Sequence, residues 1–209
     1  MATLFILGAG ASADSGLPVY RGNGTDPENY LSLSSSMNTV WDYLTPLYEA
    51  IKSHTPGPTY DALKRFPDSL ILTQNIDRYA LSTGIKTVEI HGVHDSMSCK
   101  SCKKKVVTDL SKRKCECGGD YRPDITLYGE DLDPLKCHEV YCFIAWSKPK
   151  RVVIIGTSIQ FGYLKEFIHK AKQHGAKIIH INPDPNYAEN VGYNEIWHKV
   201  PAVDGMSLL

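Results

Sequence analysis

The chain opens with a short apolar segment, residues 4–7, that runs directly into the glycine-rich turn Gly8-Ala9-Gly10. An apolar run of this length that stops at glycine predicts a buried strand. The two glycines allow a sharp turn and a close approach of the backbone to a ligand, and a helix N-terminus after such a turn presents N–H groups to phosphate. The pattern predicts a dinucleotide site, although Gly16 comes too late for the usual G-x-G-x-x-G spacing.

Further along, strand patterns and helix patterns alternate. Apolar runs predict strands at 70–73, 87–90, 152–155 and 177–181. Apolar residues at steps of three and four, together with Pro and Gly signals, predict helices at 40–51, 59–66, 134–147 and 161–171, the last closed by Gly175. This alternation predicts an α/β fold, a Rossmann-like doubly wound parallel sheet with helices on both faces.

Polar residues follow several of the predicted strands at the point where each strand ends. In parallel sheets of this kind, ligands bind at the carboxyl ends of the strands. We therefore expect one cleft to collect the glycine turn, Gln74-Asn75-Ile76-Asp77, His91, Gly156-Thr157-Ser158 and Asn182.

Four cysteines form two close pairs, Cys99-x2-Cys102 and Cys115-x-Cys117. Close pairs on tight turns suit a tetrahedral Zn(Cys)4 site, and because four thiolates fill the coordination shell, such a zinc is structural. Unmetallated thiols are the alternative. Disulfides are the weaker interpretation in a cytosolic chain.

Composition narrows the class of protein. The 209 residues suit one domain, or one domain with a small insert, and a hydrophobic content of 42% is ample for a core. The 23 basic and 23 acidic residues cancel, so no global charge favours nucleic acid. The basic runs 103–105 and 112–114 are interpreted as a solvated face, with an acidic partner or nucleic acid as the alternative. We expect no membrane span, no leader segment and a cytoplasmic location.

Several sequence blocks resemble the sirtuin family, the NAD-dependent protein lysine deacylases. Residues 8–21 are similar to the family signature G-A-G-x-S-x-x-S-G-I-P-x-F-R, with Leu17 for Ile and Tyr20 for Phe. Residues 73–77 match T-Q-N-I-D, and His91-Gly92 matches the family's H-G. The further matches, in family order, are Arg122-Pro123-Asp124 with Tyr128-Gly129-Glu130, Gly156-Thr157-Ser158 and Ile181-Asn182.

The resemblance implies an NAD-dependent protein lysine deacetylase, which converts acyl-lysine and NAD to lysine, nicotinamide and O-acyl-ADP-ribose. It implies that His91 is the general base on a ribose hydroxyl, a role that a near-neutral imidazole suits. Asn75, also catalytic, and Asp77 would lie around the nicotinamide and its ribose. Without the resemblance, His91 would be a hydrogen-bonded strand-end histidine, and residues 75–77 a turn with an N-cap aspartate.

The resemblance also implies the binding residues for NAD, for the peptide and for structural zinc. The NAD set is Gly8, Ala9, Gly10, Ser12, Tyr20, Arg21, Gln74, Asn75, Asp77, Gly156, Thr157, Ser158, Asn182 and Asp184. An acylated-lysine peptide would add as a strand between the loops Tyr128-Gly129-Glu130 and Ile159-Gln160-Phe161. Residues 22–57 contain no arginine and Lys52 is their only lysine, so we expect neutral acyl groups to be preferred.

Three units and a monomer are expected. Residues 1–21, 58–92 and 125–209 form the NAD-binding domain, 22–57 the cofactor loop and short helical insert, and 93–124 the small zinc-ribbon module. The alternative functions are a sirtuin-like NAD hydrolase or ADP-ribosyltransferase, and a catalytically silent nucleotide-binding scaffold. Arg78-Tyr79-Ala80 in place of the family's G-L-H, and a second cysteine pair one residue short, are departures from the family pattern.

Overall fold

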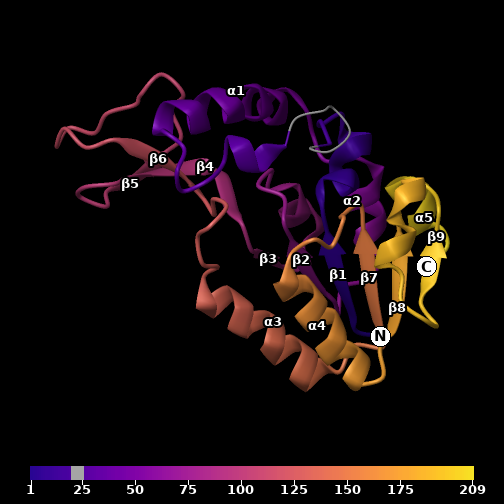
Figure 1. Ribbon diagram of the computed structural model, residues 1–209. Helices are drawn as coiled ribbons and strands as arrows, with labels where there is room; N and C mark the ends of the chain where they lie inside the picture. The colour runs from indigo at the N-terminus through magenta and orange to yellow at the C-terminus, as the bar shows by residue number, and fades with distance from the viewer. Residues whose placement is uncertain (20–25) are drawn as a thin grey trace.

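The computed structural model of the protein describes residues 1–19 and 26–209, so Tyr20 and Arg21 lie outside the described residues. The larger part is a parallel sheet in the order β3-β2-β1-β7-β8-β9, and a smaller antiparallel sheet, β5-β4-β6, projects to one side (Figure 1). The strands of the large sheet are β1 (Thr3–Leu7), β2 (Leu70–Thr73), β3 (Lys86–Glu89), β7 (Arg151–Ile155), β8 (Lys177–Ile181) and β9 (Ile196–His198).

Helices cover both faces of the large sheet. They are α1 (Met37–Ser53), α2 (Pro58–Leu63), α3 (Pro134–Ser147), α4 (Gly162–Gln173) and α5 (Ala202–Met206), with short 3-10 helices at Ala9–Ser15, Pro27–Asn29, Tyr79–Thr83 and Pro185–Asn190. Helices α3 and α4 lie on one side of the sheet, while α2 and α5 lie on the other (Figure 1). The prediction of a doubly wound α/β sheet is confirmed.

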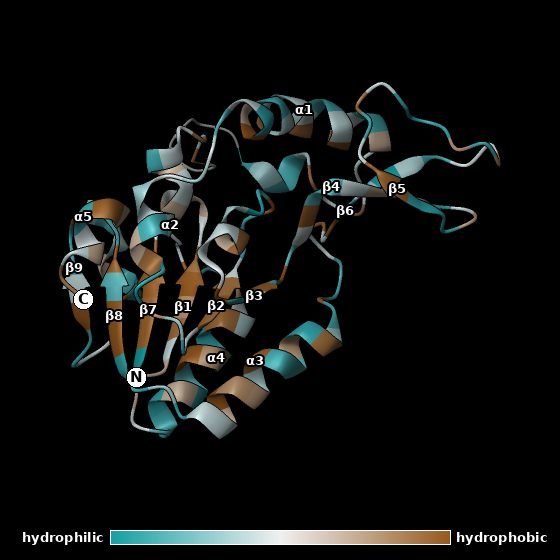
Figure 2. Cartoon of the chain, turned by 180° about the vertical axis from the view of Figure 1, so that it is seen from behind, coloured by the Kyte–Doolittle hydropathy of each residue, from teal (hydrophilic) through white to brown (hydrophobic). Residues whose placement is uncertain are grey.

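Strand β1 shows why both faces need cover, because every one of its residues is buried. Leu4 and Ile6 belong to the hydrophobic core under α3 and α4, whereas Phe5 and Leu7 belong to the core that includes residues of α1 and α2. Successive side chains of a strand point to opposite faces, so a continuous apolar run fills two cores at once. The central strands are correspondingly apolar along their length (Figure 2).

The smaller sheet consists of β4 (Gly92–Cys99), β5 (Lys105–Val107) and β6 (Tyr121–Ile125). Helix α1 begins at the Ser36 cap, whose hydroxyl accepts a hydrogen bond from the Thr39 N–H at 3.1 Å. Trp41 of α1 is fully buried, and its ring N–H donates to the Tyr121 carbonyl at 3.0 Å. This contact fixes α1 against the small sheet.

The structure extends the large sheet and its helical cover by β9 and α5, which the sequence pattern did not predict. Strand β9 extends the sheet beyond β8, the last strand expected from the pattern, with Ile181 in register with His198. Gly205 of α5 packs on Ile181, where an added Cβ would come within 2.2 Å of a side-chain carbon. Within the described residues, no helix is both long and apolar enough to cross a membrane.

Candidate active site

A cavity of about 780 Å³ opens at the carboxyl ends of β1, β2, β7 and β8. The size is within the range of ligand sites, roughly 300–1,000 Å³. Of the residues expected in the cleft, the structure places around it Gly8, Ala9, Gly10, Ser12, Gln74, Asn75, Asp77, His91, Gly156, Thr157, Ser158, Asn182 and Asp184, together with Tyr128, Gly129, Glu130 and Phe161. Gln160 is exposed and does not line the cavity.

The glycine turn after β1 is packed tightly against the turn after β7. A Cβ at Gly8 would lie 2.5 Å from the Thr157 Cβ, and a Cβ at Gly10 would lie 2.7 Å from the Gly156 Cα. Gly156 has a φ of +60°, a conformation that favours glycine. The glycines therefore serve the contact between two turns, an approach that leaves no room for a side chain.

Some of the N–H groups expected to face a phosphate are used inside the protein. The Gly8 N–H donates to the Ile155 carbonyl at 2.9 Å, the Gly10 N–H to the Gly156 carbonyl at 3.0 Å, and the Ala11 N–H to the Gly8 carbonyl at 2.9 Å. The segment that follows is a 3-10 helix rather than an α-helix. An anion that binds at this turn must therefore be bound by donors other than the N–H groups of Gly8, Gly10 and Ala11.

Ser12 joins the turn after β1 to the turn after β2. Its hydroxyl donates to the Asp77 carboxylate at 2.6 Å and accepts from the Asn75 amide at 3.1 Å. The Tyr60 hydroxyl lies 2.7 Å from the same oxygen and is the donor there, because the single Ser12 proton is already committed to Asp77. One proton and both lone pairs are in use, so the Ser12 hydroxyl, predicted to bind NAD, has no capacity left to bond a further ligand.

Asn75 is held in one orientation by this network. Its Nδ2 donates to the Gly8 carbonyl at 3.0 Å as well as to Ser12, so both amide protons are engaged. The amide carbonyl is left to accept from a ligand, and the N–H of a carboxamide is a suitable partner.

Asp77 lies at the floor of the cavity with 5% of its surface exposed. Burial raises the pKa of its carboxyl, and the hydrogen bond from Ser12 opposes that effect. The Tyr79 N–H also donates to Asp77, at 2.9 Å. Burial raises the pKa of Tyr60 as well, so the phenol stays protonated and remains a donor.

His91 follows β3 and lies between two hydrogen-bond partners. Its Nδ1 is 3.1 Å from the Gln74 carbonyl, which can only accept, so Nδ1 carries the proton. Its Nε2 lies 2.7 Å from the Tyr163 hydroxyl. Burial lowers the pKa of His91 to about 4, so the imidazole is neutral at physiological pH. Nε2 is then its one basic nitrogen.

The loop after β6 lines one side of the cavity. Glu130 pairs with Arg122 through both carboxylate oxygens and accepts from the Leu127 N–H at 2.9 Å. The backbone of Tyr128 is hydrogen-bonded to residues 31 and 33. The Tyr128 N–H donates to the Leu31 carbonyl at 2.7 Å, and the Leu33 N–H donates to the Tyr128 carbonyl at 3.0 Å. Tyr128 can therefore meet a ligand through its ring, whereas its own N–H and carbonyl are already paired.

The far side of the cavity is built by the ends of β7 and β8. The Asn182 amide donates to the Thr157 carbonyl at 3.3 Å, and the Gln74 amide donates to the Thr157 hydroxyl at 2.8 Å. Asp184 caps the 3-10 helix Pro185–Asn190 by accepting from the Asn186 N–H at 2.9 Å. Thr157 thus connects three strand ends.

Sequence reasoning missed Tyr163, which lines the cavity, and Tyr60, which contacts the cavity residue Ser12 from behind. Tyr60 lies on α2, and Tyr163 lies in the first turn of α4. Both hydroxyls meet polar partners from distant segments, and both rings pack on other aromatic rings. No local pattern distinguishes such a tyrosine from one that only fills a core.

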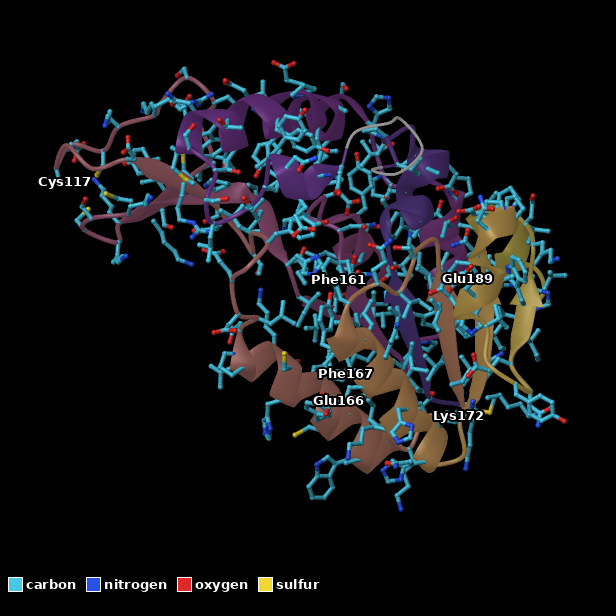
Figure 3. The ribbon with its side chains drawn as sticks, viewed as in Figure 1. Cys117, Phe161, Glu166, Phe167, Lys172 and Glu189 are labelled. Atoms are coloured by element: carbon cyan, nitrogen blue, oxygen red, sulfur yellow. The ribbon has the colours of Figure 1, made fainter. Side chains whose placement is uncertain are left out.

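The four cysteines lie together at the tip of the small sheet. All four sulfurs lie within 4.8 Å of one another, and two pairs, Cys99–Cys117 and Cys102–Cys115, are 3.4 and 3.7 Å apart. Tetrahedral zinc with Zn–S bonds of about 2.3 Å requires sulfurs about 3.8 Å apart, which this cluster meets. Figure 3 shows Cys117 at the outer end of the small sheet, far from the large sheet, so zinc bound there would stabilise the small sheet at a distance from the cavity.

Comparison with known proteins is consistent with this geometry. A model of the Sir2 family matches residues 8–162, a span that includes the glycine turn, Asn75, His91 and all four clustered cysteines. The NAD-dependent protein deacetylase of Oceanobacillus iheyensis is 30% identical over 200 residues, covering 88% of this chain and 84% of that protein. The NAD-dependent protein deacylase 2 of Pseudomonas aeruginosa is 32% identical over 207 residues, covering 86% and 80%.

Solved structures share the whole architecture. A Sir2 homolog–NAD complex superposes with a TM-score of 0.84 at 24% identity, over 99% of this chain and 87% of that one. A Sir2 structure with a p53 peptide and NAD+ superposes with a TM-score of 0.83 at 21% identity, over 99% and 91%. The small sheet and the helix α1 are therefore parts of a known fold.

Proposed function

Because this chain belongs to the Sir2 family, we propose that it is an NAD-dependent protein lysine deacetylase that prefers acetyl and other neutral acyl groups. In this reaction the acyl oxygen displaces nicotinamide at the ribose carbon of NAD, and the acyl group ends on ADP-ribose while the lysine is freed. The relatives named as deacetylase and deacylase match this chain over most of its length.

The observation that carries the proposal is the joint position of Asn75 and His91 in one cavity. The Asn75 amide is oriented by Gly8 and Ser12 so that its carbonyl can accept from the nicotinamide carboxamide. His91 offers a neutral imidazole whose Nε2 can take a proton from a ribose hydroxyl. The group that orients the cofactor, Asn75, and the base, His91, thus follow the neighbouring strands β2 and β3.

The cofactor supplies the electrophilic ribose carbon and the leaving nicotinamide. The cavity suits this cofactor. The turns that carry Gly10 and Gly156 pack closely on each other at its wall, and Asn182 and Asp184 line it at the end of β8. Asp77 lies at the cavity and accepts hydrogen bonds from Ser12 and Tyr79, and its ionised carboxylate would favour positive charge developing on a ribose.

The preference for neutral acyl groups is supported by the lining of the cavity. Among the described lining residues there are carboxylates, at Asp14, Asp77, Glu130 and Asp184, but no lysine or arginine. An acyl chain that ends in a carboxylate would find no cation there to offset the loss of its hydration. The part of the cavity that faces α1 has an apolar wall, formed by Leu44, Leu47 and Ile51.

The test is a product analysis with an acetyl-lysine peptide. Mass spectrometry should find the deacetylated peptide and O-acetyl-ADP-ribose in equal amounts, and both should require NAD. An Asn75→Ala variant should lose both products together because the carboxamide is no longer oriented. Free ADP-ribose without peptide turnover would instead indicate NAD hydrolysis, and modified protein would indicate ADP-ribosyl transfer.

We also propose that the enzyme acts as a monomer in the cytoplasm. Sedimentation of the purified chain and fractionation of the source cells test the two statements separately.

A further inference from the structure

The contact between His91 and Tyr163 lies at the basic nitrogen of the site. Because Nδ1 of His91 donates to the Gln74 carbonyl, the lone pair of the neutral ring is on Nε2. The Tyr163 hydroxyl lies 2.7 Å from Nε2 and must be the donor in that bond. Tyr163 therefore holds the atom that would receive a proton from substrate.

An imidazole nitrogen has one lone pair, in the plane of the ring. A ribose hydroxyl and the Tyr163 hydroxyl cannot both donate to Nε2 at the same time. Either Tyr163 leaves before the reaction, or the substrate hydroxyl reaches His91 through the Tyr163 oxygen, which keeps its own lone pairs as acceptors.

The packing of Tyr163 favours the second arrangement. Its ring stacks on Phe161 with centroids 5.7 Å apart and an angle of 19°, and the edge of Phe167 packs at 6.1 Å. The His91 ring is a third neighbour at 6.0 Å. Figure 3 shows Phe161 at the start of α4 and Phe167 farther along this helix, whose first turn carries Tyr163. Three neighbouring rings thus hold the partly buried Tyr163 ring beside His91.

We propose that Tyr163 is a catalytic residue that relays a proton from the ribose hydroxyl of the substrate to His91. The ribose O–H gives its proton to the Tyr163 oxygen while the Tyr163 O–H gives its proton to Nε2. Tyr163 ends neutral, the imidazole gains one proton and the ribose oxygen gains the negative charge that attacks. The inference rests on the proposed deacetylation.

Two further features are consistent with this role. Tyr163 lines the same cavity as Asn75 and Asp77, the cavity proposed to hold NAD. Burial raises the pKa of Tyr163, so the phenol remains protonated between turnovers and can act again as donor. A relay needs a group that both accepts and donates, and a neutral hydroxyl does both.

The experiment compares Tyr163→Phe with Tyr141→Phe in the acetyl-peptide assay. Tyr141 also packs on Phe167, at 4.8 Å, but lies outside the cavity, so both variants lose one hydroxyl from the same aromatic cluster. Tyr163→Phe should lower kcat by about tenfold or more with KM for NAD nearly unchanged, because general acid–base groups contribute about 10²–10⁴-fold. Tyr141→Phe should retain the wild-type kcat.

A measurement on the ligand-free protein reads the contact without turnover. The 15N chemical shift of His91 Nε2 should move toward that of an imine nitrogen without a hydrogen bond in Tyr163→Phe, while the shift of Nδ1 stays in place. An active wild type with an equally active Tyr163→Phe variant would overturn the relay and leave Tyr163 as packing. A faster variant would also overturn it and identify Tyr163 as a block on the base. A wild type that turns over no acyl peptide would instead refute the deacetylase itself.

Discussion

The Ser12 hydroxyl donates to the Asp77 carboxylate at 2.6 Å, across 65 positions of sequence. The bond joins the turn after β1 to the turn after β2 beneath the cavity, and Asn75 and Tyr60 complete the same network. One hydroxyl group therefore helps both to orient the Asn75 amide and to satisfy the buried Asp77 carboxylate.

Ser12→Ala should destabilise the protein by about 1–3 kcal/mol, because the buried Asp77 carboxylate loses its side-chain donor. Urea unfolding followed by circular dichroism measures the change. Ser34→Ala is the matched control, since the Ser34 hydroxyl bonds only at the exposed surface. Equal stability of the two variants would show that the network contributes nothing to the fold.

Gly10→Ala should lower both stability and affinity for NAD. The added Cβ would lie 2.7 Å from the Gly156 Cα, so the two turns must separate, at a cost of about 1–3 kcal/mol. Gly162→Ala provides the comparison in thermal unfolding, because nothing lies within 4 Å of the Cβ it adds. A Gly10→Ala protein with unchanged unfolding would mean that the turns are not in contact.

His91 should titrate far below an ordinary histidine. Burial lowers its pKa to about 4, so protonation on acidification occurs below the ordinary range near 6.5. The folded state binds the proton at a lower pH than the unfolded chain does. His91 therefore contributes stability above about pH 6.5, and this contribution is lost as pH falls toward 4. An NMR titration of the ring Cε1–H, assigned with His91→Gln, gives the midpoint. A midpoint near 6.5 would show that the surroundings of His91 do not lower its pKa.

Cys117→Ser should remove the bound zinc. The four sulfurs lie within 4.8 Å of one another, and metal content by plasma mass spectrometry should fall from one zinc per chain to near zero. Cys142→Ser is the control, because Cys142 lies on α3 beside His138 and outside the cluster. Zinc retained in Cys117→Ser, or no zinc in the wild type, would be inconsistent with a structural Zn(Cys)4 site.

Acetyl-lysine peptides should be better substrates than succinyl-lysine peptides of the same sequence. A carboxylate in a cavity without a described cation costs several kcal/mol, so kcat/KM should fall by about a hundredfold or more. Paired progress curves at equal NAD concentration give the ratio. A succinyl rate above the acetyl rate would reverse the proposed preference.

The fold was largely predictable because its strands are short, apolar and separated by clear helical patterns. The helix predicted at 134–147 coincides with α3, and the helix predicted at 161–171 corresponds to α4 at Gly162–Gln173. Strand β9 could not be found this way, because three residues that mix polar and apolar side chains carry no period. Its place depends on pairing with β8.

The site was predictable at the strand ends and less so between them. Topology brings the carboxyl ends of parallel strands together, which is why Asn75, His91 and Asn182 meet around one cavity. The contact partners of the glycines could not be inferred from the sequence, since Gly10 packs on a backbone atom of Gly156, in the turn after another strand. The contact of Tyr163 with His91 likewise depends on the packing of α4 across 72 positions of sequence.

Nicotinamide release from NAD, with and without an acetyl-lysine peptide, tests the central claim most directly when wild type is compared with His91→Ala. The account predicts release that depends on the peptide, matches deacetylation one for one, and is lost in His91→Ala. Release that proceeds equally without peptide, or that survives in His91→Ala, would contradict it.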